Sequence, residues 1–106
     1  MHEPEPIRSI DPDTLAGGAL YRLCTSLVVP RPIAWVSTIS SEGQANLAPF
    51  SFFNAVSDQP VVLMVSIGAR RDREKDTLRN IRQTCCFAVH VVNDRLVEQM
   101  NITATD

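Results

Sequence analysis

The chain has 106 residues, a formal net charge of −2 and 21% charged residues. This length fits a single domain, which can bury a core without disulfide or metal staples, and it excludes a second full domain. There is no sustained basic face and no apolar run near the ~20 residues that span a bilayer, so the sequence argues against nucleic-acid and membrane partners.

The amino-terminal segment is rich in residues that interrupt regular structure. It holds three prolines and the pair Gly17-Gly18, a composition that favours an extended arm over a packed element. Residues 19–27 can form a short helix, which Pro30 must end. We therefore expect an arm at 1–18 and one domain at 19–106.

A hairpin is the next predicted unit. Residues 33–39 and 46–54 are strand-like runs, and Ser40 to Gly43 between them is a tight-turn signal, so the two strands should pair antiparallel. Side-chain alternation then sets the two faces. On the first strand Trp35 and Ser37 oppose Val36 and Thr38; on the second, Ala48, Phe50, Phe52 and Asn54 oppose Leu47, Pro49, Ser51 and Phe53.

The remaining elements are shorter. Residues 61–67 form an apolar run that predicts a strand buried on both faces, and residues 85–92 predict a fourth strand. A helix should begin at 77–82 with Asp76 as its cap, and another at 94–100 capped by Asn93 or Asp94.

Together these elements predict a mainly β fold, an antiparallel sheet or barrel with short helices at its ends. Four strands are too few to close a small barrel, so a partner chain or further sequence should complete it.

A candidate anion site lies before the helix at 77–82. Six basic and three acidic side chains between Arg70 and Arg82 leave a local charge of +3, and Lys75 is the only lysine of the chain. A helix start with Lys75 and the hydroxyl of Thr77 suits a phosphate group. The alternative is a solvated charged loop before an ordinary amphipathic helix.

The hairpin offers a surface for a flat ring, because apolar side chains there are interleaved with hydroxyls and amides. The competing interpretation is that at least two of Trp35, Phe50, Phe52 and Phe53 simply belong to the core.

We expect no catalytic residue and no metal site. His90 lies in an apolar strand, where a hydrogen-bonded core residue is the usual role, and Cys85 and Cys86 are expected to be two small buried hydrophobic residues. The three cysteines lack metal-site spacing and the even count of a disulfide framework. With no apolar signal segment at residues 1–6, they indicate a reduced, cytoplasmic protein.

Three segments in order carry a resemblance to a known family. They are residues 29–38 (Val-Pro-Arg-Pro-Ile-Ala-Trp-Val-Ser-Thr), residues 46–54 (Asn-Leu-Ala-Pro-Phe-Ser-Phe-Phe-Asn), and Lys75-Asp76-Thr77 with Asn80-Ile81. From about Tyr21 to Thr105 the chain resembles the flavin reductase-like family of FMN-binding split barrels. The resemblance implies a barrel of Greek-key antiparallel strands and a homodimer. Relatives run to about twice this length, so the barrel is expected to be incomplete here.

The resemblance also implies a cofactor site. Ser37, Thr38, Lys75 and Thr77 would surround the FMN phosphate and ribityl chain. The isoalloxazine ring would lie against Asn46, Ala48, Ser51, Phe52 and Asn54, largely through backbone groups, with Trp35 beside it.

The function that this implies is an NAD(P)H:flavin oxidoreductase, in which a nicotinamide passes a hydride to flavin. Two alternatives stay open: an FMN-binding electron carrier without reductase activity, and a non-catalytic flavoprotein fragment that folds only within a dimer.

Overall fold

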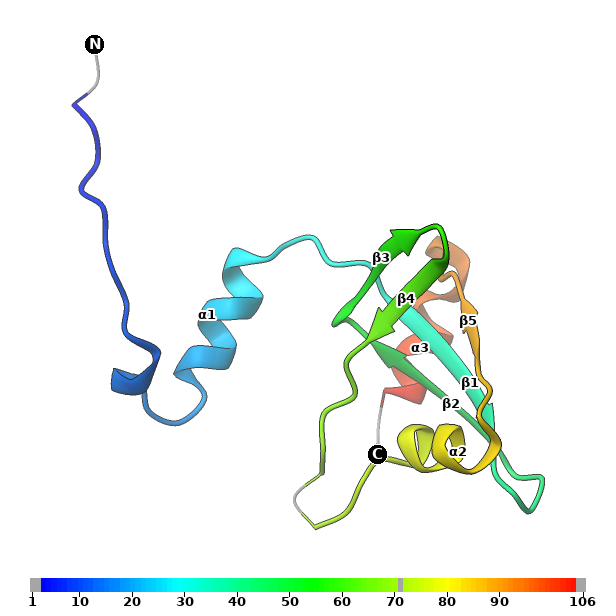
Figure 1. Cartoon of the computed structure of the whole chain (residues 1–106). Coiled ribbons are helices and arrows are strands. Elements are labelled where there is room, and N and C mark those ends of the chain that lie inside the picture. Colours follow the sequence, from blue (N-terminus) through cyan, green and yellow to red (C-terminus); the bar gives the residue numbers. More distant parts are fainter. Residues whose placement is uncertain (1–2, 71, 105–106) are drawn as a thin grey trace. The chain divides into compact units, whose positions relative to one another are not determined.

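The computed structural model describes residues 3–70 and 72–104. The chain divides into two compact units, Met1–Pro30 and Arg31–Asp106, and each is described by itself. The second unit contains all five strands of the described residues and the helices that position the candidate site (Figure 1). The domain assignment of 19–106 stays a prediction.

The first unit holds a short 3-10 helix, η1 (Pro12–Thr14), and the helix α1 (Ala19–Leu27). Asp11 caps η1, because its side chain accepts a hydrogen bond from the Asp13 amide at 3.0 Å. The helix predicted at 19–27 is thus confirmed, and it ends before Pro30.

The predicted hairpin is confirmed. β1 (Ala34–Ile39) pairs antiparallel with β2 (Ala45–Phe50), and β1 also pairs with β5 (Ala88–His90), so β1 is the central strand of a three-stranded sheet. In the turn, Gly43 has a φ of +85°, a conformation that glycine adopts without steric cost. Ser40 Oγ accepts from the Gln44 amide and stabilises the turn.

The second predicted strand, 46–54, is wrong as a single element. β2 ends at Phe50, a bend covers Ser51 and Phe52, and β3 (Phe53–Asp58) then pairs with β4 (Val61–Val65) in a separate two-stranded sheet. The cause is the partner strand. Phe50 pairs with Ala34, the first residue of β1, so residues after Phe50 have no partner there and turn toward β4.

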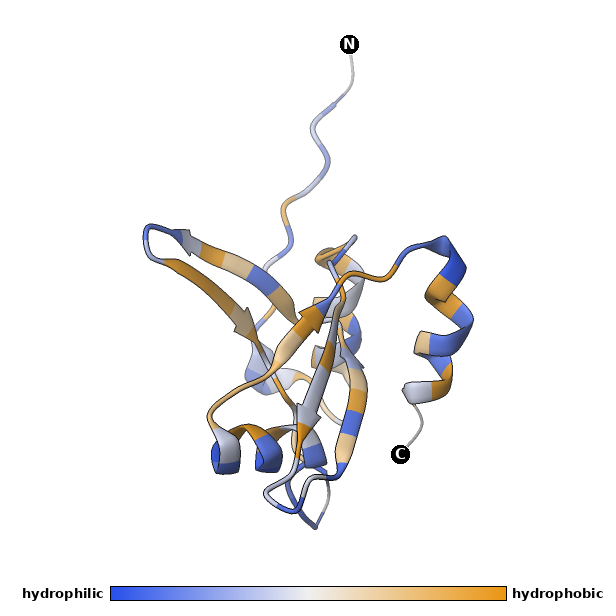
Figure 2. Cartoon of the chain, turned by 90° about the vertical axis from the view of Figure 1, so that its right-hand side faces the viewer, coloured by the Kyte–Doolittle hydropathy of each residue, from blue (hydrophilic) through white to orange (hydrophobic). Residues whose placement is uncertain are grey.

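The third predicted strand is confirmed as β4, but its burial on both faces is wrong. Val61 is 76% exposed, and Val62, Leu63 and Met64 are also exposed. β3 is the only strand paired with β4 among the described residues, so much of the hydrophobic strand seen in Figure 2 stays uncovered.

Helix α2 (Asp76–Thr84) begins one residue earlier than predicted. Lys75 is its N-cap and makes no side-chain cap bond, so the prediction that Asp76 caps this helix is wrong. The Asp76 carboxylate pairs instead with the Arg79 guanidinium at 3.0 Å, one turn along the helix.

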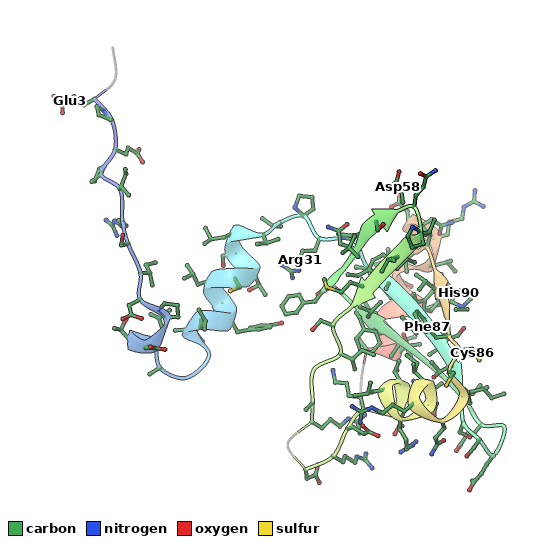
Figure 3. The ribbon with its side chains drawn as sticks, viewed as in Figure 1. Glu3, Arg31, Asp58, Cys86, Phe87 and His90 are labelled. Atoms are coloured by element: carbon green, nitrogen blue, oxygen red, sulfur yellow. The ribbon has the colours of Figure 1, made fainter. Side chains whose placement is uncertain are left out.

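The predicted strand at 85–92 shrinks to β5. Cys85 ends α2 in the left-handed region with a φ of +58°, which is incompatible with a strand. Both Cys85 and Cys86 are exposed, so their predicted burial is wrong (Cys86 is labelled in Figure 3).

The last predicted helix forms in two parts, η2 (Asp94–Leu96) and α3 (Val97–Thr103). Of the two residues predicted as possible caps, Asn93 is the N-cap of η2, because its side chain accepts a hydrogen bond from the Arg95 amide at 3.0 Å. Helix α3 packs against β2, and Thr103 accepts a hydrogen bond from Trp35 Nε1 at 2.9 Å.

The core of the second unit consists of Ala34, Val36 and Phe50, with partly buried hydrophobic residues around them. Trp35 is also buried, so two of the four candidate aromatics lie inside, as expected. An apolar groove beside Val36 runs between β4 and the residues Leu78 and Ile81 of α2. None of the described helices is long and apolar enough to cross a bilayer.

Truncating a core valine and an exposed valine to alanine should change the free energy of unfolding by different amounts. Val36→Ala removes two fully buried methyl groups and should lower the free energy of unfolding by about 2 kcal/mol. Val61→Ala, on exposed β4, should change it by less than about 0.5 kcal/mol. Urea unfolding of both variants checks this; equal losses would show that Val36 is not a core residue.

Candidate functional site

The candidate site lies where the hairpin meets the start of α2. In the register of the hairpin, Thr38 pairs directly with Asn46, so both side chains project from the same face. Ala48 and Phe50 share this face, as the sequence predicted. Helix α2 contacts both β1 and β2. The face of the hairpin toward the helix therefore carries three predicted site residues, Thr38, Asn46 and Ala48, and the core residue Phe50.

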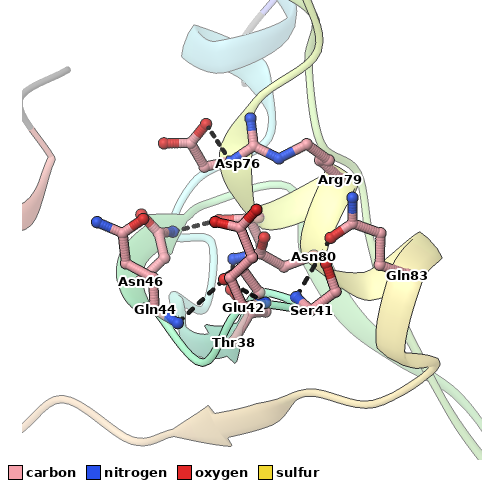
Figure 4. Close-up of polar contacts among 11 residues, drawn as sticks. Thr38, Ser41, Glu42, Gln44, Asn46, Asp76, Arg79, Asn80 and Gln83 are labelled. Atoms are coloured by element: carbon pink, nitrogen blue, oxygen red, sulfur yellow. Dashed lines mark hydrogen bonds and ion pairs between the residues drawn. The ribbon is translucent and has the colours of Figure 1, made fainter.

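Two reciprocal hydrogen bonds join that face to α2. Asn46 Nδ2 donates to Thr77 Oγ1 at 3.0 Å, and Asn80 Nδ2 donates to Thr38 Oγ1 at 3.1 Å. Each bond pairs an amide with a threonine, one running from strand to helix and the other from helix to strand (Figure 4). Thr77 and Asn80 are each only 2% exposed. The Asn80–Thr38 bond is therefore shielded from water, whereas the Asn46–Thr77 bond is part-buried, because Asn46 is partly exposed.

A pocket opens at this junction, here named the β2–α2 pocket. Its volume is about 180 Å³. It brings together four predicted site residues, Asn46, Ala48, Lys75 and Thr77. The other lining residues are Leu47, Phe50, Arg70, Asp76 and Thr103.

Positive potential converges on the β2–α2 pocket. The first amides of a helix have no intrahelical acceptor, and α2 has no side-chain cap to satisfy them. Lys75 Nζ lies 5.5 Å from the centre of the Phe50 ring, a cation–π contact that holds the ammonium beside β2. Arg70 adds a second cation to the lining. This combination suits an anion.

The backbone of β2 also faces the pocket. The Ser40 amide donates to the Gln44 carbonyl, which identifies Ser40 and Gln44 as a hydrogen-bonded pair. Antiparallel alternation then directs the backbone groups of Leu47 and Pro49 away from β1, toward the open edge of the sheet. Proline fits there, because it has no N–H to offer a neighbouring strand. No other strand of the described residues pairs with this edge of β2.

Trp35 and Ser37 lie on the opposite face of β1, away from α2. Ser37 Oγ is 2.8 Å from His90 Nε2, and the Trp35 and His90 rings meet edge to face at 6.4 Å. They line a second, larger pocket with Leu47 and Leu96. The structure therefore does not bring Ser37 to Lys75 and Thr77, and Thr38, on the side of α2, is buried with its hydroxyl engaged by Asn80.

Three predicted residues fall beyond β2. Ser51 and Phe52 form the bend, and the exposed Phe52 ring lies 5.4 Å from the Arg31 guanidinium. Asn54 is exposed on β3, where its side chain accepts from the Ala55 amide. Ser51 follows Phe50 in the sequence, but unlike Phe50 it does not line the β2–α2 pocket.

Sequence reasoning missed three contributors. Arg70 was counted only within the basic segment, and His90 was taken for a core residue, whereas it is exposed on β5 (Figure 3). Thr103 carries no local signal, because its role depends on α3 folding back to β2 and Trp35. The described residues contain no cluster of three or more His, Cys, Asp or Glu side chains that could hold a metal.

Comparison with known proteins agrees with this architecture. Residues 26–106 match the family model described as "Flavin reductase like domain". An uncharacterized protein of Aquifex aeolicus is 52% identical over 91 residues, which cover 85% of this chain and 46% of that protein. The chain therefore spans about half the length of this relative.

Two solved structures share the fold. Nitrilotriacetate monooxygenase component B from Bacillus cereus superposes with a TM-score of 0.89 at 35% identity, over 95% of this chain and 52% of that one. A split-barrel-domain protein of Shewanella frigidimarina gives a TM-score of 0.73 at 22% identity, over 89% of this chain and 46% of that one. The fold is thus the expected split barrel, mainly antiparallel strands with short helices, and partial relative to these proteins.

With the family model covering the hairpin, α2 and the pocket between them, the chain belongs to the flavin reductase-like domain family.

Proposed function

We propose that this chain is the FMN-binding part of an NAD(P)H:flavin oxidoreductase, with the FMN phosphate in the β2–α2 pocket. The observation that carries this proposal is the convergence of Lys75, Thr77, Asn46 and Ala48 on that pocket from two separate segments of the sequence, β2 and the start of α2. Family membership supports flavin as the cofactor.

The residues present fit the phosphate end of FMN. The pocket volume, about 180 Å³, is below the roughly 300–1,000 Å³ of whole small-molecule sites, so it suits the phosphate and adjoining chain. Thr77 Oγ1 accepts from Asn46, which leaves its own hydrogen for an anion oxygen. Lys75 would supply a charge-assisted bond, and Arg70 further positive potential.

The rest of the cofactor would extend along β2. The edge-facing backbone of Leu47 and Pro49 and the small side chain of Ala48 leave room for a flat ring with polar edges. Ser51, at the bend, would contact the same ring, whereas Trp35 and Ser37 would act from the other face of β1. Phe52 and Asn54 would approach it only from the segment after the bend.

FMN held by Lys75, Thr77 and the backbone of β2 would supply hydride acceptance and onward electron transfer, chemistry that would require no general acid or base from this chain. The chain's task in this proposal is to hold the phosphate, orient the ring and leave one ring face accessible. NAD(P)H as the donor, a homodimer and a cytoplasmic location, all expected from the sequence, stay predictions.

Removing single phosphate contacts tests the site. Lys75→Ala and Thr77→Ala should each weaken FMN binding about ten- to hundredfold, the effect of losing a charge-assisted hydrogen bond of about 1.5–3 kcal/mol. Riboflavin, which lacks the phosphate, should bind both variants as it binds the unmodified chain. Fluorescence titration with the two flavins measures this.

The matched control is Arg82→Ala, which also removes one positive charge from the α2 region but breaks an exposed pair with Glu74. It should change FMN affinity less than about twofold, because exposed charges are screened. If Lys75→Ala and Arg82→Ala have equal effects, or if FMN and riboflavin lose affinity together, the phosphate does not bind at the start of α2.

Reductase activity is tested separately from binding. With FMN bound, the chain should oxidise NADH or NADPH in a steady-state absorbance assay at a rate proportional to the fraction of flavin-loaded protein. Binding without turnover would favour the alternative of an FMN-binding electron carrier.

A further inference from the structure

Helix α2 is attached to the hairpin by a symmetrical polar cluster, formed by Thr38, Asn46, Thr77 and Asn80. The two strand residues are direct cross-strand partners, and the two helix residues are one turn apart on the same helix face. These two helix residues are the only ones of α2 that are buried. The cluster therefore fixes α2 at two points along its axis.

Two hydrogen bonds restrict the orientation of α2 more than one bond can. The Asn46–Thr77 bond alone would anchor the first turn of α2 but would let the helix rotate about that contact. The Asn80–Thr38 bond, one turn further on, opposes that rotation. It thereby contributes to the orientation of Lys75, the first-turn amides and the Thr77 hydroxyl.

One atom of this cluster is unfavourable for the stability of the fold. Asn80 Oδ1 is buried and accepts no hydrogen bond from any residue in 3–70 or 72–104. An unsatisfied buried acceptor destabilises a fold, so an apolar residue of similar volume would serve structure better. An amide at this position is consistent with a role in the site.

We propose that Asn80 is a positioning residue that gives the site its preference for a phosphorylated flavin over riboflavin. It acts through Thr38 and the orientation of α2, since neither Asn80 nor Thr38 lines the β2–α2 pocket. This inference rests on the proposed function and names a residue outside the pocket as the source of its selectivity.

The test compares FMN and riboflavin affinities across a small set of variants of the full chain. Asn80→Leu combined with Thr38→Val removes both members of one buried bond and leaves no unpaired partner, so the fold should be retained. Thr38→Val alone removes only the acceptor on β1 and serves as the second variant. Gln83→Ala is the matched control, because Gln83 also connects α2 to the hairpin, through the Ser41 amide, but is exposed.

In the double variant, the ratio of FMN affinity to riboflavin affinity should fall about tenfold. Its riboflavin affinity should stay within about twofold of that of the unmodified chain. Its urea midpoint should be no lower than that of the unmodified chain. Thr38→Val should lower the ratio in the same direction, and Gln83→Ala should leave it unchanged.

A purely structural role gives a different result. If either folded variant keeps the full ratio, or if FMN and riboflavin weaken by the same factor, Asn80 does not set phosphate selectivity. An unmodified chain that prefers FMN, together with variants that keep that preference, overturns this inference alone. An unmodified chain that binds neither flavin overturns the proposed function as well.

Discussion

The attachment of α2 to the β1–β2 hairpin is the constraint on which the candidate site depends. Two amide–hydroxyl bonds, one buried and one part-buried, join them, and each crosses from one element to the other. Because Thr38 and Asn80 are both buried, water competes little for the bond between them. They place the uncapped start of α2, a source of positive potential, against β2, whose outer edge pairs with no other strand of the described residues.

The central position of β1 explains why the predicted site divides into two parts. Its alternate side chains point to opposite faces, so Thr38 faces α2 while Trp35 and Ser37 face His90. A cofactor that contacts all of them must pass around the edge of the sheet at β2. In this chain the core is also open beside β4, where hydrophobic side chains remain exposed. Both features fit a chain that spans about half the length of its relatives.

Much of this could be predicted from the sequence, where local signals decide the structure. The turn before Gln44, Pro30 after α1 and the helix start near Lys75 are all short-range features, and they account for the hairpin, the end of α1 and α2. The break after Phe50 depends on where β1 begins, and the exposure of β4 depends on what covers it. The contact of Thr103 with Trp35 joins residues 68 positions apart. No local sequence pattern encodes these three features. The predictions were wrong about the break after Phe50 and the exposure of β4, and they did not include the contact of Thr103 with Trp35.

The most direct test of the phosphate position is a two-dimensional amide NMR titration of the chain with FMN and, in parallel, with riboflavin. If the phosphate binds at the start of α2, the backbone amides of Asp76, Thr77 and Leu78 shift with FMN and stay in place with riboflavin. Amides of β2 around Leu47 should shift with both flavins, because the ring is common to them. FMN-specific shifts confined to other segments, with the first turn of α2 unchanged, would contradict the proposed site.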